Sequence, residues 1–199
     1  KVKTKKEILL SAGTIGSPHI LQASGVGPGL LLKKNNINVV KDHPSVGRNL
    51  IDHLMLRPVY KVKNLDTLND IYHSYYKKII TGMKFFLFRE GPLTVGASYL
   101  CGFIKSDSHL EMPNLQFHVS PASTDFLGKT TLHNFPAFTP TIVNLRPTSR
   151  GSIEIKSPDT RIAPRIQMNY LSTDEDKKMA GKSIKITRNI VMNSKAFKK

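Results

Sequence analysis

The chain has 199 residues, with 30 Lys and Arg residues against 14 Asp and Glu residues, which gives a formal net charge of +16. A hydrophobic fraction of 39% excludes a wholly disordered chain, and the single cysteine excludes an intrachain disulfide and a cysteine-based metal site. The apolar runs are too short to span a bilayer, and the cationic residues are spread as on a solvated surface, so we predict no membrane span and no nucleic-acid partner.

The first 53 residues have the pattern of an α/β layer. Glu7–Leu10 is a short apolar run typical of a buried strand. Ser17 and Pro18 predict the start of a helix, because serine accepts a hydrogen bond from a first-turn N–H and proline needs no donor there. Gly25 is placed to end that helix with a positive φ. A short helix over 30–35 and a strand over 37–40 are expected next.

From residue 54 the pattern predicts an antiparallel sheet backed by helices. Gly151–Lys156 alternates apolar and charged residues, as a half-exposed strand does, and 161–168 is expected to pair with it. Ser172 and Glu175 have the spacing of a capping box at the start of a long helix over 173–194. Another helix is predicted over 66–88, and further strands are predicted over 59–62, 98–104, 115–119 and 141–145.

The strand, turn and helix predicted over 7–25 have the form of an anion or cofactor cradle, since a helix N-terminus presents free N–H groups. Two glycine pairs, Gly13 with Gly16 and Gly25 with Gly27, each supply part of the dinucleotide fingerprint G-x-G-x-x-G. Neither pair stands in the required frame. The pattern alone therefore favours a tight connection in an α/β layer.

Several segments carry a resemblance to a known family. Residues 13–27, GTIGSPHILQASGVG, resemble the second signature of the glucose–methanol–choline family of flavin oxidoreductases. Residues 46–53, VGRNLIDH, resemble the V-G-x-N-L-x-D-H segment of that family. Three further segments resemble conserved segments of its insect glucose-dehydrogenase-like branch, in the expected order. They are GPLT at 91–94, LRPTSRG at 145–151 and NYL at 169–171. The resemblance spans essentially the whole chain.

The resemblance implies a fold and a cofactor. It implies an α/β flavin-domain remnant over 1–53 and an α+β substrate domain with an antiparallel sheet over 54–199. Family members bind FAD. Ala12 and Gly13 would lie close to the cofactor through their backbone, so that a side chain at Gly13 would collide with FAD or with the following helix. Asn49 and Asp52 would shape the flavin-side wall. Each pair also has a structural alternative. Ala12 and Gly13 could be needed for tight helix–sheet packing, and Asn49 and Asp52 could cap a loop with their short polar side chains.

The resemblance also implies an activity, namely oxidation of the CH–OH group of an alcohol or sugar by hydride transfer to the flavin. The general base of the family is a histidine beyond the long helix, whereas the last histidine here is His133. We therefore expect an internal fragment, inactive alone, with no catalytic residue of its own and an undetermined electron acceptor. The same resemblance suggests an extracellular location. A catalytically inactive binding or carrier protein derived from this family is the alternative.

Overall fold

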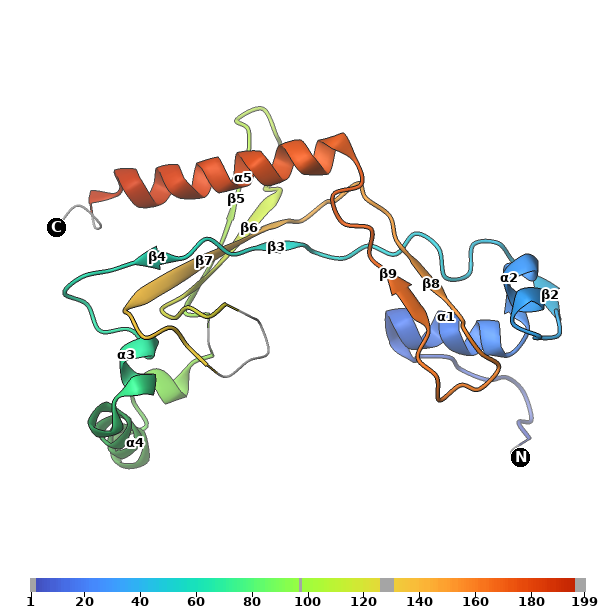
Figure 1. The fold of residues 1–199 in the computed structure, drawn as a ribbon, viewed down its shortest axis with the longest axis horizontal. Coiled ribbons are helices and arrows are strands. Elements are labelled where there is room, and N and C mark those ends of the chain that lie inside the picture. Colours follow the sequence, from blue (N-terminus) through green and yellow to red (C-terminus); the bar gives the residue numbers. More distant parts are fainter. Residues whose placement is uncertain (1–2, 97, 126–130, 196–199) are drawn as a thin grey trace. The chain divides into compact units, whose positions relative to one another are not determined.

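The computed structural model describes residues 3–96, 98–125 and 131–195, which form two compact units (Figure 1). The first unit joins Lys1–Asp52 to Pro147–Asp176, and the second joins His53–Arg146 to Lys177–Lys199. The fold is mixed α/β with antiparallel sheets, which confirms the predicted class. The division into a flavin domain over 1–53 and a substrate domain over 54–199 stays a prediction, because a compact unit carries no functional assignment by itself.

The first unit has a small core between two helices and two short strand pairs. Leu32, Ile37 and Ile155 are buried together, with Ala23 and Val39 packed against them. β1 and β2 pair in parallel, and β8 and β9 pair antiparallel, as expected for 151–156 and 161–168. The elements are α1 (Gly13–Ala23), β1 (Val26–Gly27), α2 (Gly29–Lys34), β2 (Lys41–Asp42), β8 (Ser152–Glu154) and β9 (Arg165–Gln167).

Two predictions near the N-terminus are wrong. Glu7–Leu10 forms no strand, and Ile8 and Leu9 are 80% and 83% exposed, because no described segment supplies the ladder hydrogen bonds that a strand needs. The first helix begins at Gly13, four residues before Ser17. Ser17 therefore lies inside the helix and not before it. Its hydroxyl still accepts a hydrogen bond from the backbone N–H of Ala12 at 3.1 Å.

The end of α1 follows the prediction. Gly25 has a φ of +83° and directly follows the C-cap residue Ser24. The strand expected over 37–40 begins later, at Lys41, because the N–H groups of Val40 and Lys41 both donate to the carbonyl of Gly25, and the ladder proper continues from there. The sequence pattern predicts the position of this strand within a few residues, whereas its pairing register depends on the carbonyl of Gly25.

The second unit is built on an antiparallel sheet in which β3, β7, β6 and β5 are neighbours and β4 also pairs with β7. The helix α5 (Asp174–Asn193) lies along this sheet (Figure 1), and its Met179 and Ile186 pack against the buried Leu115, Phe117 and Ile142. The strands are β3 (Met55–Leu56), β4 (Tyr60–Lys61), β5 (Leu100–Ile104), β6 (Leu115–Ser120) and β7 (Ala137–Asn144).

The helix predicted over 66–88 is two helices, α3 (Leu68–His73) and α4 (Tyr75–Phe88), followed by the short 3₁₀ helix η1 (Pro92–Thr94). Ser74 interrupts the helix with an extended backbone, and its hydroxyl accepts from the N–H of Lys77 at 3.3 Å. A serine that caps the second helix therefore ends the first. No helix in the described ranges is both long and apolar enough to cross a membrane.

The long helix α5 starts as predicted, but Ser172 and Glu175 do not cap it. The hydroxyl of Thr173 accepts from the N–H of Asp176 at 3.3 Å, while the buried Asp176 carboxylate accepts from the N–H groups of Thr148 and Ser149 at 2.9 and 2.8 Å. Burial raises the pKa of Asp176, but these hydrogen bonds outweigh it and hold the pKa below its usual value. A bond to a distant loop thus replaces the local capping box.

Candidate cofactor-binding site

Gln22 joins two of the segments that carry the family resemblance. It is fully buried in α1, where its side-chain N–H donates to the carbonyl of Ile153 at 2.9 Å and to that of Val46 at 3.3 Å. Its side-chain oxygen accepts from the N–H of Ile155 at 2.7 Å. One amide thereby satisfies three backbone groups and fixes segment 46–53 and strand β8 to the helix of segment 13–27.

Segment 46–53 is hydrogen-bonded to Gly151 and to strand β8. Leu50 and Gly151 exchange backbone hydrogen bonds of 3.1 and 2.8 Å. Gly47 has a φ of +79°, and its carbonyl accepts from the N–H of Ile153 at 2.7 Å. A Cβ on Gly47 would lie 2.2 Å from the carbonyl oxygen of Ile153, so only glycine allows this approach. The structure therefore brings 46–53 and 145–151 together.

Asp52, a predicted cofactor-site residue, accepts a hydrogen bond from the hydroxyl of Tyr170 in the NYL segment. The adjacent Asn169 donates to the carbonyl of Arg150 at 3.0 Å. Asn49, the other predicted residue of this segment, is exposed and has a φ of +59°, which a short polar side chain tolerates. All four resemblance segments of the first unit are thus linked by hydrogen bonds.

The Asp52–Tyr170 pair predicts a pH effect. The hydrogen bond to Asp52, aided by burial, raises the pKa of Tyr170 from 10.0 to about 12. Because the folded-state value lies above the unfolded one, the stability from this bond is fully present below pH 10 and is lost as the pH rises through 12. We expect the Asp52→Asn variant to return Tyr170 toward its ordinary pKa in a spectrophotometric tyrosinate titration.

The Tyr170→Phe variant is the control for that titration. Burial also raises the pKa of Tyr99, so the difference between the unchanged protein and Tyr170→Phe isolates the Tyr170 signal. Titration of Tyr170 near its ordinary value in the unchanged protein would show that the hydrogen bond to Asp52 does not form.

Ala12 and Gly13 lie at the exposed start of α1. Gly13 has a φ of +77°, and a Cβ there would meet no atom within 4 Å apart from its chain neighbours and the backbone of its own helix. The predicted collision with FAD or with the helix stays a prediction, and the backbone angle is the feature of this structure that favours glycine here. No hydrogen bond among the described residues joins Ala12 or Gly13 to Asn49 or Asp52.

Two family models match the chain, and both are described as GMC oxidoreductase, the glucose–methanol–choline family. One covers residues 1–55 and the other covers residues 147–199, together more than half of the chain. These ranges contain the segments at 13–27, 46–53 and 169–171, and residues 147–151 of the fourth. The chain belongs to the GMC oxidoreductase family.

Bacterial choline dehydrogenases are among the relatives of this GMC chain. It is 37% identical over 192 residues to the oxygen-dependent choline dehydrogenase of Photobacterium profundum, covering 96% of this chain and 33% of that protein. It is 38% identical over 192 residues to the same enzyme of Acinetobacter baumannii, covering 94% of this chain and 34% of that protein. The chain thus spans about a third of the length of these relatives. The insect glucose-dehydrogenase-like branch stays a prediction.

Solved structures of other proteins share the fold. Formate oxidase of Aspergillus oryzae matches with a TM-score of 0.84 and 23% identity over 98% of this chain and 38% of that one. An FAD-dependent oxidoreductase from Chaetomium thermophilum matches with a TM-score of 0.80 and 21% identity over 98% of this chain and 39% of that one. The family and these neighbours indicate FAD as the cofactor, as predicted.

The surface around Gly13 fits part of such a cofactor. Gly13 is exposed, and no side chain or other segment of the described residues stands where its Cβ would be, so another molecule can approach the backbone closely. The first turn of α1 contains no acidic residue, so the partial positive charge of the helix N-terminus is not neutralised from within the helix. Ala12 and Gly13 could therefore hold an anionic or electron-rich part of FAD at this end of α1.

Sequence reasoning missed Gln22, Gly47 and Tyr170 as residues that hold the site together. Gln22 was recognisable as a polar residue between Leu21 and Ala23, inside an apolar helical stretch. Gly47 precedes Asn49 in a segment that already showed the family pattern. The partnership of Tyr170 with Asp52 left no local signal, since 118 positions separate the two residues.

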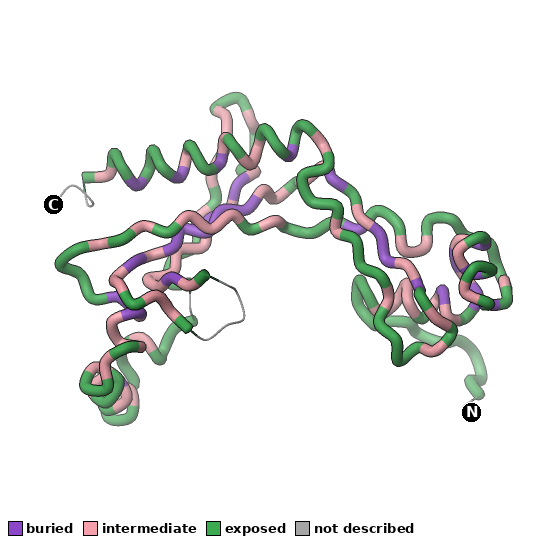
Figure 2. The backbone as a smooth tube through the Cα atoms, in the orientation of Figure 1, coloured by how far each residue is buried: buried purple, intermediate pink, exposed green. Residues whose placement is uncertain are grey.

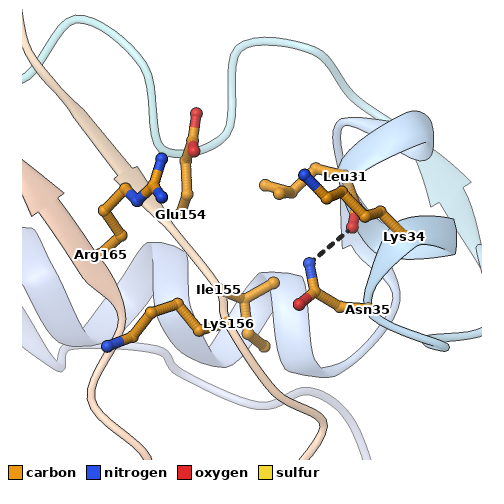
Figure 3. Close-up of a pocket in the computed structure, with 7 residues that line it drawn as sticks. All are labelled: Leu31, Lys34, Asn35, Glu154, Ile155, Lys156 and Arg165. Carbon is orange, nitrogen blue, oxygen red and sulfur yellow. Dashed lines mark hydrogen bonds between the residues drawn. The ribbon is translucent and has the colours of Figure 1, made fainter.

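A separate pocket of about 160 Å³ lies elsewhere in the first unit. Figure 3 shows that its Lys34 and Lys156 ammonium groups lie on opposite sides, so its cations do not converge on one point. Glu154, which also lines it, is already paired with Arg48 at 2.9 Å. None of the predicted cofactor-site residues lines this pocket. Its other lining residues are Leu31, Asn35, Ile155 and Arg165.

Proposed function

We propose that this chain is part of an FAD-dependent oxidoreductase that oxidises the CH–OH group of an alcohol or sugar by hydride transfer to the flavin. The observation that carries the proposal is the buried Gln22 amide, which ties the second family signature to segment 46–53 and to β8. A family signature folded into its own three-dimensional context is stronger support than a motif match alone. FAD would supply the redox chemistry.

The residues of this chain would bind and orient the cofactor. The backbone of Ala12 and Gly13, at the start of α1, would lie close to the cofactor. The open surface there supports this role. Asn49 and Asp52 would form part of the flavin-side wall. Their segment is held by the Leu50–Gly151 backbone pair, and Asp52 is held by Tyr170. A wall fixed on both sides keeps a bound ring in one orientation, which favours hydride transfer.

Two substrate classes are open to the proposed enzyme. The bacterial relatives are choline dehydrogenases, which favours an amino alcohol, whereas the GPLT, LRPTSRG and NYL segments resemble the insect glucose-dehydrogenase-like branch. An extracellular location, implied by the same resemblance, belongs to this proposal as well. The electron acceptor differs between oxidases and dehydrogenases and has to be found by assay.

The experiment is anaerobic reduction of the flavin in the full-length protein that contains these residues. We expect the purified protein to be yellow and its flavin absorbance to be bleached by an alcohol, with choline and glucose compared directly. A protein that binds FAD and is bleached by no alcohol or sugar would support the inactive carrier alternative. A full-length protein that binds no flavin at all would contradict the proposal.

A further inference from the structure

The helix α4 of the second unit carries an uncovered apolar stripe. At 3.6 residues per turn, six of its exposed apolar residues fall within an arc of about 120° on one side of the helix, while Phe88, the last residue of α4, is 67% exposed and lies outside this arc. Tyr75 is 85% exposed and Phe86 is 75% exposed at the two ends of this stripe. Figure 2 shows α4 as one of the most exposed helices of the chain. The six stripe residues are Tyr75, Tyr76, Ile79, Met83, Phe86 and Leu87.

The opposite side of α4 faces the protein. Thr81 is its buried residue, and it lies about 180° from the middle of the stripe on a helical wheel. Lys77, on the same side as Thr81, forms an ion pair with Asp66 at 2.6 Å. Up to Leu87 the helix is therefore anchored through one face, with the stripe on the other side. The exposed Phe88, the last residue of α4, lies about 20° from Thr81 on the helical wheel.

Cations flank the stripe on both sides. Lys78 lies about 60° beyond Tyr75 on the helical wheel, and Lys84 lies about 60° beyond Leu87. The Lys78 ammonium group is 5.4 Å from the centre of the Tyr75 ring, so the charge stands at the edge of the stripe. No Asp or Glu occurs between Asp70 and Glu90. The exposed face of α4 is thus apolar, aromatic and cationic, with no negative charge.

We propose that this face of α4 binds the surface of an anionic lipid bilayer, with the helix lying in the plane of the interface. Apolar and aromatic side chains would enter the boundary between headgroups and acyl chains, and the flanking lysines would pair with lipid phosphates and carboxylates. The charge pattern favours this occupant over a second copy of the chain, because two copies facing each other would bring Lys78 and Lys84 toward like charges.

The test uses a tryptophan reporter in the full-length protein, because the 199 residues of this chain contain none, and the emission of the unchanged full-length protein is the baseline. Phe86→Trp places it in the stripe. Leu30→Trp, at a residue 87% exposed on α2, is the matched control outside it. Emission is recorded with vesicles of phosphatidylcholine alone and with vesicles that also contain phosphatidylserine. We expect a blue shift for Phe86→Trp with the anionic vesicles only, and its loss at about 0.5 M salt, where charges are screened.

Charge reversal provides the second arm. In the Phe86→Trp background, the Lys78→Glu and Lys84→Glu pair should weaken binding to anionic vesicles by about tenfold or more, since each juxtamembrane cation contributes strongly. The Lys5→Glu and Lys6→Glu pair, with the same charge change elsewhere, should leave binding close to that of the background.

Three results would overturn the proposal. One is no shift with anionic vesicles. Another is an equal shift for Leu30→Trp, which would indicate general adsorption of a basic protein. The third is a blue-shifted emission without vesicles that grows with protein concentration, which would show that a second copy covers the stripe.

Discussion

Replacing Gly47 with alanine should destabilise the first unit by about 3 kcal/mol or more, because the substitution combines backbone strain with a collision. The φ of +79° is unfavourable for any residue with a Cβ. That Cβ would also stand 2.2 Å from the carbonyl oxygen of Ile153 and 2.4 Å from the side-chain nitrogen of Gln22. Urea unfolding followed by circular dichroism measures the effect.

Gly13→Ala is the matched control for Gly47→Ala. Gly13 has nearly the same φ, +77°, but a Cβ there meets nothing within 4 Å beyond its chain neighbours and the backbone of its own helix, so only strain of about 1 kcal/mol is expected. The difference between the two variants reports the collision alone. Equal losses would mean that β8 does not lie against Gly47 as described.

The Gln22→Leu variant should lose about 3 kcal/mol of unfolding free energy. Leucine nearly matches the volume of glutamine, but it would leave the carbonyls of Val46 and Ile153 and the N–H of Ile155 without their partner in a buried site. An unsatisfied buried backbone group costs more than an ordinary hydrogen bond contributes. In the full-length protein the same change should also lower flavin content, because it releases segment 46–53.

Gln167→Leu is the control for Gln22→Leu. Gln167 lies on β9 in the same unit with an exposed side chain, so the identical substitution should change stability by at most about 0.5 kcal/mol. A small effect at Gln22, comparable to that at Gln167, would show that the buried amide does not hold the segments together.

The sequence was enough to predict the class of the fold and most of its elements. Apolar alternation and turn residues placed β8, its partner β9 and the long helix α5 within a few residues, because these features are local. The strand expected at Glu7–Leu10 and the capping box of Ser172 failed for the opposite reason. A strand needs a partner, and Asp176, at the third position of α5, bonds to a loop 28 residues away. Neither condition is visible locally.

The candidate site, like the fold, has features that the sequence predicts and features that depend on distant contacts. The family segments that contain Ala12, Gly13, Asn49 and Asp52 could be found from the sequence, because their residue types and spacing are distinctive. Several of the hydrogen bonds that hold these segments together come from Gln22 and Tyr170, and these two residues have partners more than 100 positions distant. Their contribution depends on burial and hydrogen-bond geometry, which the folded chain alone provides.

The most direct test of the proposed cofactor site is the amount of flavin bound per protein in the Gly13→Val variant of the full-length enzyme. The proposal predicts a clear loss of visible flavin absorbance, because valine would fill the open space beside the helix and oppose the positive φ. Lys5→Ala, on the exposed segment before it, should keep full flavin. A thermal melt separates lost binding from unfolding. A folded Gly13→Val enzyme with undiminished flavin would contradict the placement of FAD at the start of α1.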